Sequence, residues 1–150
     1  MNDKSLEIIF GALDHLSVEL PSWGFANTGT RFGKFIQPAA ASTIEEKFSD
    51  ATQVHTFTGA CKTLALHVQW DLPHGLSDVP NVKSLTEKFA IRAGSINPNI
   101  FQDQEYKYGS VGNPDPAIRR RAVRHILDCV AIADALGSSD IWAGLAGGAG

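Results

Sequence analysis

Apolar residues follow two periods along this chain, one typical of amphipathic helices and one typical of short buried strands. The helical period, together with capping residues and helix-ending glycines, predicts helices at residues 6–13, 42–59, 82–89 and 115–137. Short apolar runs predict strands at residues 16–20, 64–68 and 91–96, with a final strand beginning at residue 140. Because helices separate successive strands, the connections must be crossovers and the expected sheet is parallel.

Two of the predicted helices have clear start signals. Ser42 with Glu45 three residues later forms a capping box, which places the start of the second helix at Ser42. Asp115 followed by Pro116 is an N-cap with proline at the first helical position, and Gly137 is the corresponding stop. The segment 115–137 is therefore the best-defined helix of the sequence.

The helix at 115–137 has one apolar and one basic set of residues. The apolar stripe, expected to be buried, consists of Val123, Ile126, Leu127 and Val130. The basic set consists of Arg119, Arg120, Arg121 and Arg124. Four arginines could bind phosphate or nucleic acid, but a charged helix face is more often solvated, which is the interpretation adopted here.

Loop lengths separate the two architectures that fit this order, a doubly wound open sheet and a closed barrel. Long loops rich in aromatic residues follow strands at 22–41 and 97–114, whereas the connections from helix to strand are short. This asymmetry is typical of a barrel with its active site at the carboxyl ends of the strands. Residues 1–150 are therefore expected to form one partial α/β domain, the N-terminal part of a (β/α)8 TIM barrel with about four parallel strands, since a full barrel needs about 250 residues.

Composition and charge narrow the classes of function. The chain has 150 residues, of which 43% are hydrophobic and 19% charged, as expected for a domain with a core. A net charge of −3 gives no electrostatic reason to expect nucleic acid or an anionic membrane as partner. A small-molecule ligand is the better expectation.

The cysteines and the N-terminus bear on the compartment. Cys61 and Cys129 stand far apart, outside any metal-binding spacing, and are interpreted as reduced, packed thiols. The sequence shows no signal segment, and no apolar run approaches the ~18 residues of a membrane span. A cytoplasmic protein is therefore expected.

His67 is the first candidate for chemistry. It lies inside the second predicted strand, near its carboxyl end, with Trp70 and Asp71 in the next four positions. A histidine alone in a strand is more often a packed core residue. The carboxylate favours a functional role, since Asp71 could fix the ring tautomer of His67 and leave the other ring nitrogen for a substrate hydroxyl.

The loops after the first and third strands supply the other candidates. Trp23 and the glycine-containing stretch 28–32 could wall a pocket, and residues 96–110 contribute amides, aromatic residues and a carboxylate. Each has a simpler interpretation, a hydrophobic plug for the first and a turn-rich loop for the second. Neither is a specific motif such as a phosphate-binding loop.

Four short stretches, taken together and in order, resemble the N-terminal part of bacterial L-rhamnose isomerases. They are Leu-Pro-Ser-Trp-Gly with Thr-Gly-Thr-Arg-Phe (20–32), Leu-His-Val-Gln-Trp-Asp (66–71), Asn-Pro-Asn-Ile-Phe (97–101) and Tyr-Lys-Tyr-Gly-Ser (106–110). The resemblance runs from about residue 16 to about residue 141. It implies a xylose-isomerase-like barrel, a homo-oligomer that in this family is a homotetramer, and conversion of L-rhamnose to L-rhamnulose with a divalent metal, commonly manganese.

The resemblance also implies roles for individual residues. His67 would be catalytic, by hydrogen-bonding a sugar hydroxyl and assisting ring opening. Trp23 and Phe101 would wall the substrate pocket, and Phe32 would reach into the pocket of a neighbouring subunit. The expected substrate-binding set is Trp23, Phe32, His67, Trp70, Asp71 and Phe101.

The metal ligands implied by the resemblance belong to later strands, so no residue of this chain is assigned as a ligand. After Ile141 the sequence departs from the family pattern, and a truncated, inactive form with a self-associating open sheet is expected. Two alternatives stay open. One is a sugar-phosphate isomerase or epimerase of the same superfamily, and the other is a non-catalytic sugar-binding or assembly module.

Overall fold

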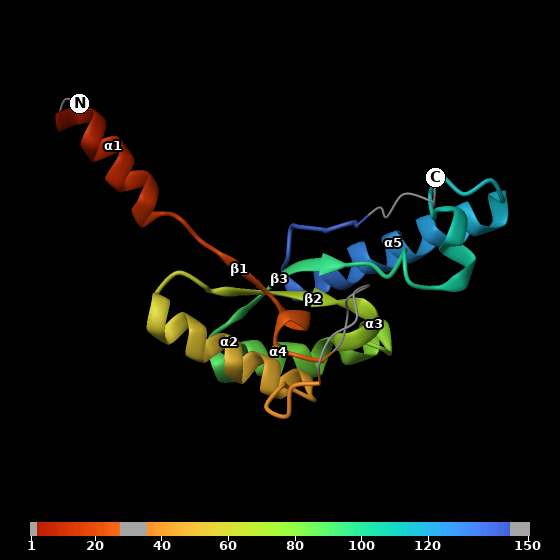
Figure 1. Ribbon diagram of the computed structural model, residues 1–150, viewed down its shortest axis with the longest axis horizontal. Coiled ribbons are helices and arrows are strands. Elements are labelled where there is room, and N and C mark those ends of the chain that lie inside the picture. Colours follow the sequence, from red (N-terminus) through yellow and green to blue (C-terminus); the bar gives the residue numbers. More distant parts are fainter. Residues whose placement is uncertain (1–2, 28–35, 145–150) are drawn as a thin grey trace.

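Three short parallel strands form the sheet, in the order β1-β2-β3 (Figure 1). The computed structural model describes residues 3–27 and 36–144. Within them the strands are β1 (Glu19–Pro21), β2 (Thr63–His67) and β3 (Arg92–Asn97). Leu20 pairs with Leu64, and Leu66 pairs with Ile96. The parallel pairing that the alternation of strands and helices predicted is confirmed.

Five α-helices accompany these strands in the described part of the chain. They are α1 (Asp3–Asp14), α2 (Ile44–Thr58), α3 (Val68–Asp71), α4 (Val79–Phe89) and α5 (Pro116–Leu136). Short 3₁₀ turns occupy η1 (Ser22–Gly24), η2 (Gly75–Asp78) and η3 (Gln104–Tyr108). None of the described helices is both long and apolar enough to cross a bilayer.

The start of α2 lies one residue later than the sequence suggested. Thr43 is the N-cap, and its side chain accepts a hydrogen bond of 3.2 Å from the Glu46 amide. The Glu46 carboxylate in turn accepts from the backbone amides of Thr43 (3.1 Å) and Ser42 (2.6 Å). Two overlapping capping pairs exist in Ser-Thr-Ile-Glu-Glu, and the chain uses the second.

The ends of α5 are as predicted. The Asp115 carboxylate accepts a hydrogen bond of 2.7 Å from the Ala117 amide, and Pro116 opens the helix. Gly137 ends it with a φ of 71°, a left-handed conformation that glycine adopts without strain.

The main core lies between the sheet and α2, α4 and α5. Its fully buried members include Phe48 from α2, Leu66 from β2, Val82 from α4 and Cys129 from α5. Cys61 and Cys129 are both free and buried, as expected. Burial also raises the pKa of the Cys129 thiol to about 12, so this thiol is a packing group.

The buried face of α5 differs from the prediction. The buried residues are Ala122, Cys129, Ile132 and Ala133. Much of the expected stripe is exposed instead, with Val123 at 48%, Leu127 at 61% and Val130 at 46%. This helix has apolar residues on two faces, and the face with small residues packs closely on β3. The arginine set is largely solvated, as expected, since Arg120, Arg121 and Arg124 are exposed.

The expectation of a partial (β/α)8 barrel with about four strands is wrong. The described structure is a small α/β domain whose sheet has three parallel strands. The expected fourth strand contributes only an isolated bridge, in which Ile141 lies beside Ile96. That segment follows α5 directly and leads into Ala-Gly-Leu-Ala-Gly-Gly, which has little strand propensity. Long loops after strands are also common to open parallel sheets, so they did not distinguish the two folds.

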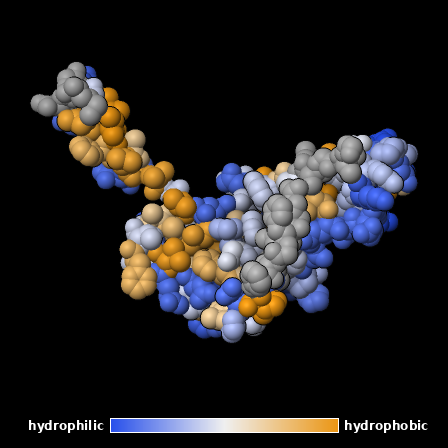
Figure 2. All heavy atoms as spheres, in the orientation of Figure 1, coloured by the Kyte–Doolittle hydropathy of each residue, from blue (hydrophilic) through white to orange (hydrophobic). Residues whose placement is uncertain are grey.

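The first helix stands apart from this body. Figure 1 shows α1 projecting from the sheet on the segment that leads into β1, and Figure 2 shows hydrophobic residues along this arm. Phe10 is 59% exposed and Leu13 is 57% exposed. The arm is joined to the body by a hydrogen bond of 3.0 Å from the Val18 amide to the Ala60 carbonyl.

Candidate functional site

Four of the residues predicted for the site come together at the carboxyl ends of the strands. Trp23 lies in η1 directly after β1, His67 is the last residue of β2, and Trp70 lies in α3. Phe101 lies in the loop after β3. Parallel strands place the segments that follow them at one edge of the sheet, which explains why residues far apart in sequence meet here.

Aromatic rings enclose the imidazole of His67. The Trp70 indole stacks on it, with ring centroids 3.7 Å apart and an interplanar angle of 18°. Trp23 and Phe101 approach it edge-on, with centroids at 6.2 Å and 6.0 Å. His67 is fully buried as a result. The three rings and the imidazole are called the aromatic box below.

The imidazole of His67 is held neutral and without hydrogen-bond partners. Neither ring nitrogen has a partner among the described residues. Burial lowers the pKa of His67 to about 4, against a smaller raising effect from Asp71. A neutral imidazole has one donor and one acceptor nitrogen. Both are available to a hydroxyl that enters the box.

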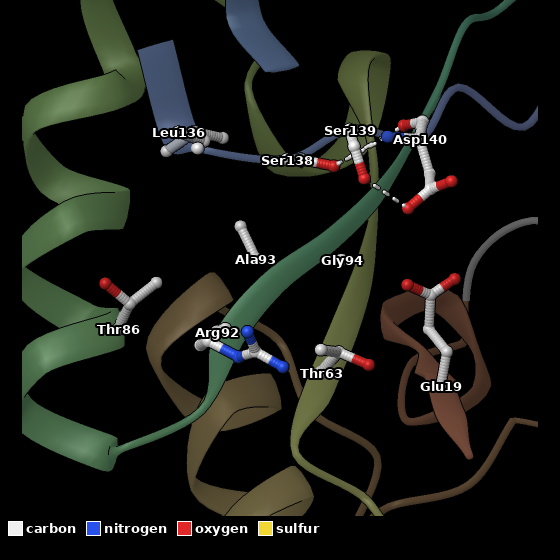
Figure 3. Close-up of a pocket in the computed structure, with 11 residues that line it drawn as sticks. Glu19, Thr63, Thr86, Arg92, Ala93, Gly94, Leu136, Ser138, Ser139 and Asp140 are labelled. Atoms are coloured by element: carbon white, nitrogen blue, oxygen red, sulfur yellow. Dashed lines mark hydrogen bonds between the residues drawn. The ribbon is translucent and has the colours of Figure 1, made fainter. Parts of the chain in front are cut away.

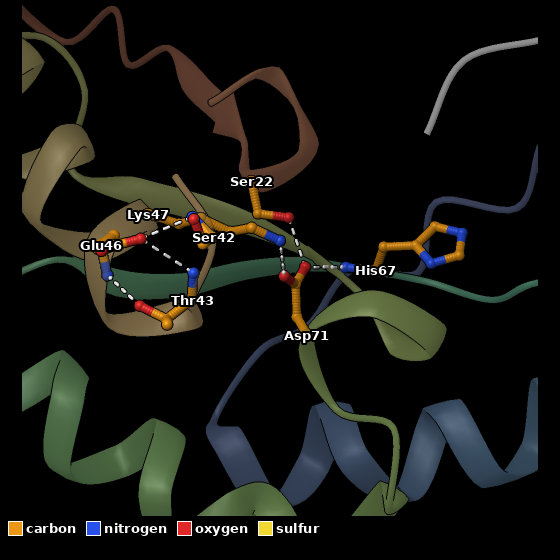
Figure 4. A network of polar contacts seen from close by, with 7 residues as sticks. All are labelled: Ser22, Ser42, Thr43, Glu46, Lys47, His67 and Asp71. Atoms are coloured by element: carbon orange, nitrogen blue, oxygen red, sulfur yellow. Dashed lines mark hydrogen bonds and ion pairs between the residues drawn. The ribbon is translucent and has the colours of Figure 1, made fainter. Parts of the chain in front are cut away.

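Both carboxylate oxygens of Asp71 accept hydrogen bonds from other groups of the chain. Its Oδ1 accepts a hydrogen bond of 2.7 Å from Lys47 Nζ, and its Oδ2 accepts from the His67 backbone amide at 2.7 Å and from Ser22 Oγ (Figure 4). The side chain has no exposed surface. Asp71 therefore does not bond the imidazole, contrary to the role in fixing its tautomer, and its contacts fit positioning better than substrate binding.

This network, called the Asp71 network below, links the elements that carry the aromatic box. Ser22 precedes Trp23 in η1, the His67 amide stands at the junction of β2 and α3, and Lys47 belongs to α2. One buried carboxylate with three donors thus ties three segments together. Its full set of partners offsets the cost of burying the charge.

Lys47 was missed as a site residue, although a signal existed. It occupies the buried stripe of α2 beside Phe48 and Ala51, and its side chain is only 5% exposed. A lysine in an apolar stripe needs a buried carboxylate as partner. The sequence does not identify that carboxylate, because Asp71 lies 24 residues from Lys47 along the chain.

Trp142 was also missed. It follows the bridge at Ile141 and stacks on Trp23, with centroids 5.8 Å apart and an interplanar angle of 17°. It is 54% exposed and forms the outer wall of the aromatic box. The signal was an aromatic residue in the segment predicted to begin the last strand. Phe32, the remaining predicted residue, lies outside the described residues.

The loop after β3 is ordered by polar contacts with α5. The backbone amide of Asn99 donates a hydrogen bond of 3.0 Å to His125 Nε2. This makes Nδ1 the protonated nitrogen when the His125 ring is neutral. Tyr106 in η3 is buried against Ala122 of α5. This loop has a structural role in holding Phe101 against His67.

Two cavities lie away from the aromatic box. One, of about 320 Å³, opens at the amino ends of the strands, with Glu19, Arg92 and Asp140 in its wall (Figure 3). There Glu19 accepts hydrogen bonds of 2.6 and 2.5 Å from the amide and hydroxyl of Ser95. The other, of about 430 Å³, lies between α3 and α5. His67 lines neither of these two cavities.

The described residues do not fit a metal ion. No three histidine, cysteine, aspartate or glutamate side chains within residues 3–27 and 36–144 are grouped so as to hold one. The carboxylate nearest to His67 is Asp71, whose two oxygens already have three donors. No step of the chemistry below is therefore derived through a metal.

Two curated proteins named probable sugar isomerase are similar to this chain. One, from Rhizobium meliloti, is 35% identical over 134 residues, which cover 85% of this chain and 30% of that protein. The other, from Mesorhizobium japonicum, is 31% identical over 147 residues, which cover 93% of this chain and 33% of that protein. No protein-family model matches the chain. The chain spans about a third of the length of these relatives, and over most of its own length it is similar to them.

Proposed function

We propose that this chain is the sugar-binding part of an aldose–ketose isomerase, with His67 as the group that hydrogen-bonds the sugar. The observation that carries the proposal is the buried, neutral imidazole of His67, which has two unpartnered nitrogens inside an aromatic box. The similarity to two probable sugar isomerases supports the reaction class.

The aromatic box suits a sugar for a physical reason. One face of a pyranose presents C–H groups that pack on indole and phenyl rings, while its hydroxyls need hydrogen-bond partners. Trp23 and Phe101 supply apolar walls, and His67 supplies one donor and one acceptor. Because His67 is fully buried under the stacked Trp70 indole, a sugar reaches the imidazole only if a ring of the box moves.

The chemistry assigned to His67 is hydrogen bonding during ring opening. An aldose must open before its carbonyl can move from C1 to C2, and opening transfers the anomeric hydroxyl proton to the ring oxygen. A pKa of about 4 makes His67 a weak base, so it orients and polarises that hydroxyl without storing the proton. L-rhamnose is the aldose to test first, and manganese, expected from the resemblance, is assigned to no described residue.

For the sugar-phosphate alternative, the described residues next to the aromatic box offer one lysine that is already paired. Lys47, the lysine next to the aromatic box, is buried and paired with Asp71 at 2.7 Å, so it is not free for a phosphate. A non-catalytic sugar-binding module would make the same contacts with the sugar. It would differ only in that it does not convert the aldose to the ketose.

The experiment is an assay of L-rhamnulose formation from L-rhamnose by the 150-residue chain with added manganese. His67→Ala is the test variant, and His74→Ala, which alters an exposed histidine at η2, is the matched control. Ketose formation that is lost only in His67→Ala supports the proposal. Sugar binding without ketose would favour the non-catalytic module, and ketose formation by both variants would remove His67 from the reaction.

A further inference from the structure

We infer that α1 of one chain docks on the exposed face of α5 in a second copy of the chain. The docking segment is the apolar stripe of α1, formed by Leu6, Ile9, Phe10 and Leu13. The receiving surface is the outer stripe of α5, formed by Val123, Leu127 and Val130. This inference is independent of the sugar-binding proposal.

The helix α1 needs a packing partner. It has 12 residues, and isolated helices of this length are marginal in water. Ile9 is 43% exposed, Phe10 59% and Leu13 57%, so the stripe is open along the arm (Figure 2). An amphipathic helix gains most of its stability from covering such a stripe.

The two stripes match in length, and they lie apart within one chain. Residues 6–13 and 123–130 each span seven steps, which is about 10 Å of helix at 1.5 Å per residue. Figure 1 shows α1 projecting on one side of the molecule and α5 lying on the other. In a dimer of two antiparallel copies, α1 of each copy lies on α5 of the other. The same contact then forms twice, and the assembly closes as a dimer.

The charges of α1 and α5 are complementary. The sequence of α1 has three acidic residues and one lysine, a formal net charge of −2, whereas α5 has four arginines and two aspartates, a formal net charge of +2. Arg120 and Arg124 are exposed and precede Val123 and Leu127 by three residues, so helical spacing sets them beside the stripe. Glu7 lies three residues before Phe10 and Asp14 four residues after it, so helical spacing sets both carboxylates beside the stripe of α1.

This charge pattern also favours protein over lipid as the occupant. Helices that lie on anionic bilayers carry lysine and arginine on their polar face. The net negative charge of α1 opposes that mode. The basic α5 of a second copy complements it.

Sedimentation of the full 150-residue chain over a wide range of concentration tests the inference. A reversible dimer is expected for the wild type. Leu13→Glu on α1 and Leu127→Glu on α5 should each raise the dissociation constant by at least about tenfold, because each sets a charge in an apolar contact. Phe57→Glu is the control, since Phe57 is 87% exposed and lies outside both stripes.

Two further arms make the result specific to these two faces. A mixture of Leu13→Glu and Leu127→Glu chains should associate more strongly than either alone, because the mixed dimer keeps one intact contact. The pair Arg120→Glu and Arg124→Glu should weaken the dimer, and adding Glu7→Lys and Asp14→Lys should restore it.

Three results would overturn the inference. One is a wild type that stays monomeric, including the case in which it cosediments with phosphatidylcholine vesicles, which would assign α1 to a bilayer. Another is association that Leu127→Glu leaves unchanged. The third is a mixture of the two variants that associates no better than its parts. Circular dichroism of each variant checks that the fold is intact.

Discussion

Asp71 and His67 lie four residues apart and are both buried, but their polar atoms have opposite surroundings. The Asp71 carboxylate accepts hydrogen bonds from three donors that come from three segments of the chain. The His67 imidazole has no hydrogen-bond partner at either nitrogen among the described residues. The fully partnered group holds the structure together, and the unpartnered one is available to a ligand.

Burial of the unpartnered His67 nitrogens costs folding free energy, which also favours a role for this ring in ligand binding. A buried polar group without a partner costs folding free energy, on the order of 1–3 kcal/mol. Histidine at position 67, surrounded by indole and phenyl rings, therefore destabilises the fold by about this amount. Phenylalanine at the same position would not, because it has no polar atoms to bury. The contrast between the two residues can be tested by changing each one.

The largest effect is expected from Asp71→Ala. This change leaves the Lys47 ammonium buried without its partner, and breaking such a pair costs about 3–5 kcal/mol. The free energy of unfolding, measured by urea denaturation, should fall accordingly. The matched control is Glu45→Ala, which removes the ion pair with Lys88, whose two side chains are 54% and 58% exposed.

An exposed ion pair contributes at most about 1 kcal/mol, so the Glu45→Ala variant should stay close to the wild type. Equal losses in the two variants would show that the Asp71 network does not stabilise the fold as its burial indicates.

The next effect is a dependence of stability on pH that belongs to His67. Its pKa in the folded protein is about 4, lowered from 6.5 mainly by burial. Between these values the unfolded chain binds the extra proton, so the folded state loses stability as the pH falls from 6.5 towards 4. The full shift corresponds to about 3 kcal/mol.

The measurement is the difference in unfolding free energy between wild type and His67→Phe as a function of pH. The wild type should lose stability relative to the variant across this window. His125, whose pKa is also lowered by burial, is present in both proteins and cancels. A difference that does not change with pH would mean that His67 is solvated in solution.

The smallest effect on stability is expected from His67→Phe at neutral pH. Phenylalanine has a similar shape, and no hydrogen bond of the imidazole is lost. The unfolding free energy should change by less than about 1.5 kcal/mol, in either direction. A loss as large as that of Asp71→Ala would show that His67 has a structural partner, and the contrast between the two residues would fail.

Features set by neighbouring residues were predictable from the sequence. Asp115, Pro116 and Gly137 fix the ends of α5 through local hydrogen bonds and backbone preferences. The convergence of Trp23 and His67 was also predictable, because both lie at the carboxyl ends of strands in a parallel sheet.

Features that depend on distant residues were not predictable. The partner of Lys47 and the exposed face of α5 are decided by what packs against each helix. One local feature was also missed, because two overlapping capping pairs exist and spacing alone does not show that the chain uses the one at Thr43. The number of strands was overestimated because a single bridge at Ile141 has the same apolar signal as a short strand.

The most direct test of the central claim is a calorimetric titration of L-rhamnose into the wild type and His67→Phe, both shown to be folded. Heat of binding is expected for the wild type and its loss in the variant, because the imidazole is the one ring of the aromatic box that offers the sugar a hydrogen-bond acceptor. Binding of equal strength by both proteins, or by neither, would contradict the assignment of His67 as the sugar-binding group.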